Sequence, residues 1–189
     1  MNFDSAHICL PMPGEKQNGD AVLVRSDERG EAMFAVIDGL GHGPEAAQAS
    51  RAAVALLESL PIGVGVLAAM QGLHRALRGT RGAAATLCVV KDSMLEVCAV
   101  GNVALMCANC VVPLVLSAGV LGHQVAKFRV SSSVLKPGAR VALLSDGVST
   151  RFRIEELRHY GPAEACEFIM ARHRRREDDA TVLIADTRA

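Results

Sequence analysis

The sequence predicts an α+β domain in which two sheets form the core and helices lie outside them. Three observations indicate this class. Short apolar strand patterns occupy both ends of the chain, Ala- and Leu-rich segments with helical spacing come in pairs, and no internal repeat, low-complexity stretch or linker divides the chain. A chain of 189 residues can bury a sizeable core, so 1–189 is expected to form a single domain.

The predicted elements alternate between groups of strands and pairs of helices. Strands are expected at 1–10, 20–25, 31–38, 83–90, 95–100, 128–132, 140–145 and 181–186, with two or more further short strands between 100 and 116. Turns at 27–30, 92–93 and 137–138 separate several of them. Helices are expected at 45–60, 64–78, 154–160 and 162–174.

The charge balance argues against nucleic acid or an anionic membrane as a partner. The formal net charge is zero, and aromatic side chains that could stack on bases are scarce, with no Trp. Residues 97–122 carry no charge, but Asn102, Asn109 and Pro113 interrupt them, so short strands explain this stretch better than a membrane span. The first residues lack the basic start of a signal peptide, and we expect a cytoplasmic protein.

The six cysteines are expected to be reduced and scattered through core and turn positions. Cys107 and Cys110 form a CxxC pair. A structural zinc site needs further ligands, and the chain has no second CxxC. A redox CxxC opens a helix after a strand, whereas this one straddles a predicted hairpin turn. A thiol-based redox or zinc protein is therefore an alternative that the pattern does not favour.

Acidic residues stand at the ends of four apolar strand patterns. Asp38 and Asp146 each follow an apolar run and precede a glycine, whereas Asp20 and the pair 178–179 each precede one. Taken singly, such a position is more often a turn. If the four ends converge, the carboxylates would repel one another, and a hard divalent cation such as Mg²⁺ or Mn²⁺ would relieve the repulsion. Two such metals can activate a water for in-line attack on a phosphate, so no side-chain nucleophile is needed.

The segment Asp38-Gly39-Leu40-Gly41-His42-Gly43 resembles the signature of bacterial PPM-type serine/threonine phosphatases of the SpoIIE branch. The segments 145–148 (SDGV) and 178–182 (DDATV) resemble the later motifs of that family, in the same order. The resemblance extends from about residue 18 to residue 184, and the short length is most similar to RsbX-type phosphatases of the stressosome pathway. It implies an αββα sandwich of two antiparallel sheets flanked by helix pairs, with the metal site at one edge of the sheets.

The resemblance also implies roles for individual residues around two Mn²⁺ or Mg²⁺ ions. Asp38 would bridge the metals and the Gly39 carbonyl would bind one of them. Asp146 and Asp178 would hold the other, so Asp38 and Asp146 are the carboxylates on which catalysis depends. Asp20 would support the Gly39 side directly or through water. Asp179 matches a position where relatives carry Asn or Asp and is assigned outside the direct ligands.

Other candidate residues are more ambiguous. His42 could protonate the leaving serine oxygen because imidazole titrates near neutrality, but the turn context favours a ring that caps backbone groups. The basic run 172–176 could steer an acidic partner, or it could be a solvated helix end. Many eukaryotic relatives use an N-terminal arginine to contact the substrate phosphate. No clear match exists here, since Lys16 and Arg25 fit only loosely.

These features together predict a monomeric phosphoserine/phosphothreonine phosphatase without nucleic-acid or membrane partners. The resemblance implies that its substrate is a phosphorylated STAS-domain signalling protein of a stressosome. The short loops after residue 119 favour an open site suited to a folded phosphoprotein. The alternative is a non-catalytic module that keeps the PPM fold and captures a regulatory partner. The four acidic strand ends argue against it, because a pure binding module does not need them.

Overall fold

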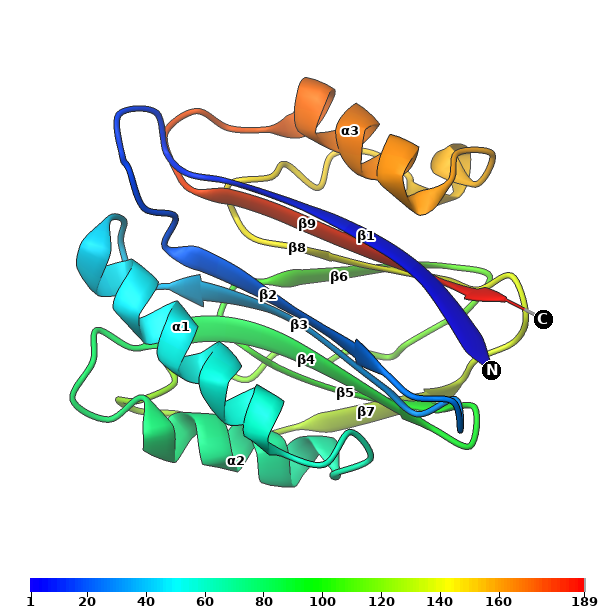
Figure 1. Cartoon of the computed structure of the whole chain (residues 1–189), viewed down its shortest axis with the longest axis horizontal. Coiled ribbons are helices and arrows are strands. Elements are labelled where there is room, and N and C mark those ends of the chain that lie inside the picture. Colours follow the sequence, from blue (N-terminus) through cyan, green and yellow to red (C-terminus); the bar gives the residue numbers. More distant parts are fainter. Residues whose placement is uncertain (189) are drawn as a thin grey trace.

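The computed structural model describes residues 1–188 and contains two antiparallel sheets stacked face to face between helical layers (Figure 1). One sheet has the order β1-β9-β8-β6, from Asn2–Leu10, Ala180–Arg188, Arg140–Leu144 and Ala104–Ala108. The other has the order β2-β3-β4-β5-β7, from Asp20–Ser26, Ala32–Gly39, Ala83–Lys91, Met94–Val100 and Val130–Val134. Helices α1 (Pro44–Ser59) and α2 (Val66–Ala76) cover the second sheet, and α3 (Pro162–His173) covers the first. The predicted αββα sandwich is confirmed.

Three apolar layers hold this architecture together. One lies between α1, α2 and the five-stranded sheet, the second lies between the sheets, and the third lies between α3 and the four-stranded sheet. Strand β3, an inner strand of the five-stranded sheet, is buried on both faces up to Ile37, and Asp38 is its first partly exposed residue. Continuous burial explains why the sequence of β3 is an unbroken apolar run instead of an alternating pattern.

The glycine-rich turn after β3 leads directly into α1. Gly41 and Gly43 have φ values of 81° and 76°, which side chains with a Cβ rarely adopt. Pro44 then opens the helix, where its missing N–H costs no hydrogen bond. Leu60 is extended ahead of Pro61, so the helix ends where the sequence predicts.

Two local predictions are wrong. The expected helix at 154–160 is a four-residue 3₁₀ turn, η1 (Ile154–Leu157), so α3 has this turn and not a second α-helix as its neighbour. Only β6 forms between residues 100 and 116, and it pairs with β8 far along the chain. Asn109, with φ 55°, then turns the backbone out of the sheet, and 109–129 pairs only through isolated bridges. The CxxC pair therefore lies at a strand end and not across a hairpin.

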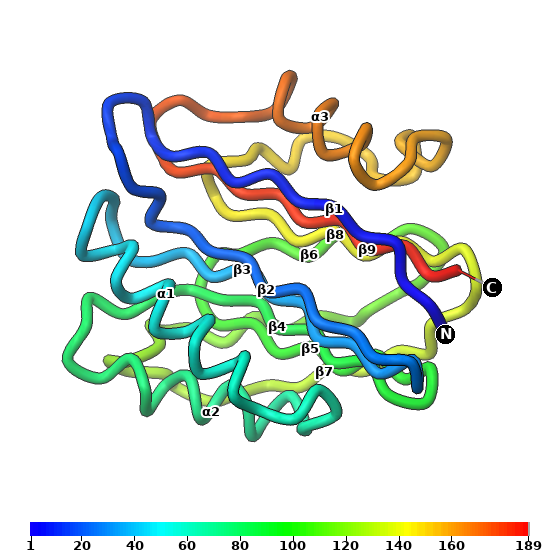
Figure 2. The backbone as a smooth tube through the Cα atoms, in the orientation of Figure 1, coloured from blue at the N-terminus to red at the C-terminus, as the bar shows by residue number. Residues whose placement is uncertain are grey.

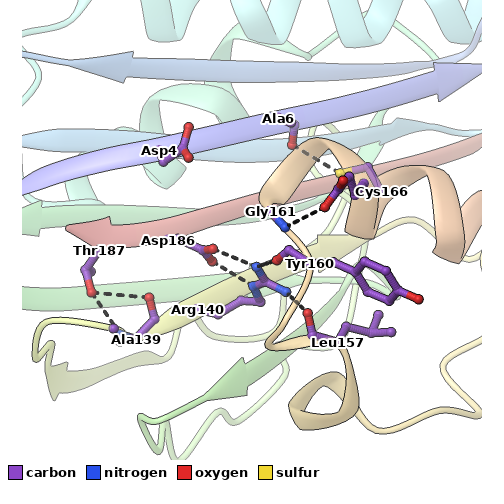
Figure 3. Close-up of polar contacts among 12 residues, drawn as sticks. Asp4, Ala6, Ala139, Arg140, Leu157, Tyr160, Gly161, Cys166, Asp186 and Thr187 are labelled. Atoms are coloured by element: carbon purple, nitrogen blue, oxygen red, sulfur yellow. Dashed lines mark hydrogen bonds and ion pairs between the residues drawn. The ribbon is translucent and has the colours of Figure 1, made fainter.

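A buried arginine connects the four-stranded sheet to the segment that leads into α3 (Figure 3). Arg140 opens β8 and forms a bidentate pair with Asp186 of β9, at 2.7 and 2.6 Å. Its other donors reach the carbonyl oxygens of Leu157 and Tyr160, each at 2.7 Å. Every hydrogen bond therefore ties the start of β8 to a neighbouring segment.

The two ends of the described chain lie side by side, because β1 pairs with β9 along its whole length, from Asn2 opposite Arg188 onward (Figure 2). Across residues 1–188, no helix has the length and apolar character required to span a membrane.

Candidate active site

The fold brings all the predicted acidic residues to one end of the two sheets, on the left in Figure 1. Asp20 opens β2 and lies directly opposite Asp38 at the end of β3. Because β8 and β9 are antiparallel, Asp146 after β8 meets Asp178 and Asp179 before β9. Residues from four separate parts of the sequence thus share one edge.

Ser145 joins the two sheets at this edge. Its hydroxyl donates to Asp20 Oδ2 at 2.7 Å and accepts the Thr181 N–H at 2.9 Å. Both Ser145 and Asp20 are buried, so this bond fixes the Asp20 carboxylate relative to β8 and β9. The Asp20 N–H in turn donates to Asn18 Oδ1 at 2.9 Å.

Asp179 anchors the loop between β1 and β2. Its two carboxylate oxygens accept the N–H groups of Met12 at 2.8 Å and Gly19 at 2.9 Å. The side chain is buried, and both oxygens are engaged by backbone. Close packing continues at Gly147, where a Cβ would lie 1.9 Å from the Asp179 carbonyl oxygen, so this position requires glycine. Asp179 therefore holds the loop between β1 and β2 against the start of β9.

Asp146 and Asp178 lie in a more exposed part of the same edge. Asn102, in the turn before β6, donates from Nδ2 to Asp146 Oδ2 at 2.6 Å. The Asp179 N–H donates to Asp178 Oδ1 at 2.9 Å. Each carboxylate thus has one protein donor and keeps acceptor capacity for a further ligand.

Three carboxylates at this edge have raised pKa values. Burial, with repulsion from Asp179 and Asp178, raises the pKa of Asp20 to about 7, although the Ser145 hydroxyl opposes this shift. Burial and repulsion from Asp20 and Asp146 raise the pKa of Asp38 to about 8. Burial, with repulsion from Asp146, also raises the pKa of Asp178. Several carboxylates therefore lie close enough to disfavour one another's charge, and a cation would remove that penalty.

The donor set fits hard divalent cations bound in an open site. Within residues 1–188, no group of three or more His, Cys, Asp or Glu side chains is arranged so that it could hold one metal ion. Such a group is not required for Mg²⁺, since Mg²⁺ sites commonly use one or two carboxylates and keep several waters. The Asn18 Nδ2 group is buried near Asp20 without a partner in the described chain, so it has a free donor for a water at this edge.

The remaining candidates lie in different settings. His42 is exposed, and its Nδ1 contacts Glu15 Oε1 at 2.7 Å instead of capping backbone groups. Its positive form would lower the pKa of Asp178, so the ring lies near the cluster. Arg25 donates to the carbonyl oxygens of Leu57 and Leu60 at the end of α1, away from the site, and Lys16 is exposed in the loop between β1 and β2.

The basic run supports the backbone of the site. Arg174 Nη2 donates to the Pro11 carbonyl at 2.7 Å, and the Arg175 N–H donates to the Gly147 carbonyl at 2.8 Å. Arg172 lies over the Phe168 ring at 4.7 Å. The basic run therefore starts in the last turn of α3, and its later residues contact the backbone next to Asp146.

Ser145 and Asn102 are site residues that the sequence did not single out. Ser145 gave a weak signal, since it is a polar residue inside an apolar strand pattern just before Asp-Gly. The sequence predicts only a turn at Asn102. Its contact with Asp146 spans 44 positions, and spacing alone does not reveal such a contact.

Comparisons with known proteins identify the family and the fold of this chain. The family model of stage II sporulation protein E (SpoIIE) matches residues 28–188. No curated protein sequence matches the chain. A chain from a study of the bacterial stressosome, described as a modular system adapted to control secondary messenger signaling, is 31% identical; the match covers 98% of this chain and 100% of that one, with a TM-score of 0.90.

Two further structures share the fold at lower identity. RsbX in complex with magnesium is 23% identical over 97% of this chain and 94% of that one, with a TM-score of 0.85. The catalytic domain of the serine threonine protein phosphatase PstP, in complex with two manganese ions, is 19% identical over 99% of both chains, with a TM-score of 0.73.

Proposed function

The chain belongs to the SpoIIE family of PPM-type serine/threonine phosphatases, and from this premise we propose that it dephosphorylates a STAS-domain protein of a stressosome. The convergence of five aspartates at one sheet edge carries the enzymatic part of this proposal. A non-catalytic module would gain nothing from burying Asp20 and Asp38 side by side, because their repulsion destabilises the metal-free fold.

The residues that would hold two Mn²⁺ or Mg²⁺ ions are Asp38, Asp146 and Asp178, with the Gly39 carbonyl and Asp20 on the β2 side. Two bound ions would supply a water of lowered pKa and neutralise charge on the phosphate oxygens. Ser145 and Asn102 orient Asp20 and Asp146 through hydrogen bonds, so those carboxylates are positioned before a ligand arrives. Asp179 keeps the loop between β1 and β2 in place.

The substrate assignment is supported by the 31% identical chain from a stressosome study. The open edge suits a phosphoserine or phosphothreonine on a folded surface. We expect the enzyme to act on this scaffold as a cytoplasmic monomer.

Hydrolysis of p-nitrophenyl phosphate with Mn²⁺, with and without a chelator, tests the enzymatic part. Chelator-sensitive turnover is expected. No turnover, combined with tight binding of a STAS-domain protein, would favour the alternative of a binding module.

The substrate assignment is tested by comparing the rates of hydrolysis of a phosphorylated STAS-domain protein, its unfolded phosphopeptide and a panel of phosphometabolites. A much larger kcat/KM for the folded phosphoprotein is expected, whereas preference for a metabolite would overturn the signalling assignment.

A further inference from the structure

A groove lies beside the glycine-rich turn, next to the aspartate cluster. Its volume is about 620 Å³, and it is bounded by Leu40, the first turns of α1, and the loops at 79–81 and 120–123. None of the five aspartates of the site lines it. The polar side chains that do line it are those of Glu45, Gln48, Thr80, Arg81 and His123.

Hydrogen bonds hold the backbone at Arg81 and Gly82 to the two neighbouring segments that border this groove. The carbonyl oxygen of the next residue, Gly82, accepts the Leu40 N–H at 3.0 Å. His123 Nε2 donates to the Arg81 carbonyl oxygen at 2.9 Å. Arg81 is therefore tied to the turn after β3 and to the loop that contains His123.

The guanidinium group of Arg81 lies across Gly41, three residues after Asp38. A Cβ on Gly41 would lie 2.9 Å from Arg81 Nη1, and Gly41 has φ +81°, so a side chain there would disturb both the turn and the arginine. Arg81 Nε pairs with Glu45 in the first turn of α1. Nη1 and Nη2 form no hydrogen bond within the part of the chain that the structure describes, so most of the donor capacity of Arg81 is unused.

The ion pair between Arg81 and Glu45 is weak enough for another carboxylate to replace Glu45. The two side chains are 48% and 66% exposed, and ion pairs of this kind are weak and screened by salt. Glu45 nevertheless demonstrates that a carboxylate can approach Nε from the groove. A carboxylate on a bound partner could occupy the same position and also reach a terminal nitrogen, which gives the stronger bidentate geometry.

We propose that this groove binds the polypeptide segment next to the phosphorylated residue of the substrate, and that Arg81 binds an acidic side chain of that segment. The inference rests on the proposed phosphatase function. The scissile phosphate belongs at the aspartate cluster, which lies outside the groove, so Arg81 selects the flanking sequence and does not take part in the chemical step. Gln48 and Thr80 provide neutral polar groups that line the same groove.

Two synthetic phosphoserine peptides test this assignment. They have equal length, and the residues on either side of the phosphoserine are Glu in one and Gln in the other. Wild-type enzyme with Mn²⁺ should show a kcat/KM about two- to fivefold higher for the acidic peptide, as expected for one exposed charge-assisted contact. Arg81→Ala should abolish this preference, and Glu45→Gln should increase it, because the competing carboxylate is removed. Both variants should hydrolyse p-nitrophenyl phosphate at the wild-type rate.

Arg78→Ala is the matched control, since Arg78 is an exposed arginine that does not line the groove. It should keep the wild-type preference. The inference is overturned if wild type does not prefer the acidic peptide, if Arg81→Ala retains the preference, or if neither peptide is hydrolysed while p-nitrophenyl phosphate is. Failure to hydrolyse p-nitrophenyl phosphate would instead overturn the proposed function, and the inference with it.

Discussion

Asp20 and Asp38 lie directly opposite each other on β2 and β3, and both carboxylates are largely removed from water. Two neighbouring buried acids with raised pKa values are costly for a fold that holds no cation. This pairing links the stability of the protein to its proposed chemistry, because the arrangement that would bind divalent metal is the one that destabilises the metal-free protein.

Replacing Asp38 with Asn should abolish phosphatase activity and leave the fold intact. The substitution removes the carboxylate proposed to bridge two metals, and it also removes a repulsive charge from the metal-free state. We expect the Tm of Asp38→Asn in chelator to exceed that of wild type by several degrees at neutral pH. Asp146→Asn should likewise be inactive. Wild-type turnover in Asp38→Asn would contradict the two-metal assignment.

The stability of the metal-free protein should fall as pH rises from the ordinary aspartate range to about 8. The raised pKa values of Asp20, about 7, and Asp38, about 8, mean that the folded protein holds protons that the unfolded chain has released. The free energy of unfolding therefore decreases with pH across this window. Thermal unfolding in chelator from about pH 5 to about pH 9 measures this slope.

Saturating Mn²⁺ should remove or reverse the same slope, because the cation stabilises the charged carboxylates. Asp38→Asn is the control, and its unfolding should depend less on pH. A metal-free wild type that became more stable between pH 5 and pH 8 would show that the two acids are not the dominant titrating groups.

Asn102→Ala should weaken metal binding without unfolding the protein. Asn102 donates to Asp146 Oδ2 at 2.6 Å, and loss of a partner that orients a metal ligand typically lowers metal affinity about 10- to 100-fold. The expected result is a shift of the Mn²⁺ activation curve to higher concentration, matched by calorimetric Mn²⁺ binding. Asn2→Ala, an exposed asparagine in β1, is the control. An unchanged activation curve would mean that Asn102 does not position Asp146.

Arg140→Ala should destabilise the fold without acting on the metals directly. It would leave Asp186 and the carbonyl oxygens of Leu157 and Tyr160 without their donor, and breaking a buried pair in this way costs about 3–5 kcal/mol. Urea unfolding measures the loss. Arg188→Ala, which removes the exposed pair with Asp4, should cost less than about 1 kcal/mol. Equal losses in the two variants would contradict the structural role assigned to Arg140.

Cys107→Ser/Cys110→Ser should retain metal-dependent hydrolysis. Both thiols are partly buried against the core between the sheets. The hydrogen bond between them and burial raise the pKa of Cys107, and the same hydrogen bond lowers the pKa of Cys110. We expect a modest stability loss, about 1 kcal/mol, measured by thermal unfolding. Stoichiometric Zn²⁺ in wild type that is lost in the variant would overturn this view of the cysteines.

The two-sheet class and most strand and helix positions could be predicted because they depend on local patterns. The apolar run of β3 is long enough to identify a buried strand, and Pro44 and Pro61 bracket α1. The prediction of further strands between residues 100 and 116 failed because strand pairing there depends on distant residues and not on the local sequence pattern. The chain after Asn109 is apolar enough for strands, yet β6 pairs with the distant β8 instead of forming a hairpin with the segment that follows it.

The sequence by itself determined which residues could form the site, since four apolar strands each have an acidic residue at one end. Only the tertiary structure decided that these ends meet, because the antiparallel pairing of β2 with β3 and of β8 with β9 sets their positions. It also decided that Ser145 orients Asp20, that Asn102 orients Asp146, and that Arg81 lies beside Gly41. Such contacts join residues far apart in the chain, and their energies depend on burial and distance, which composition and spacing do not contain.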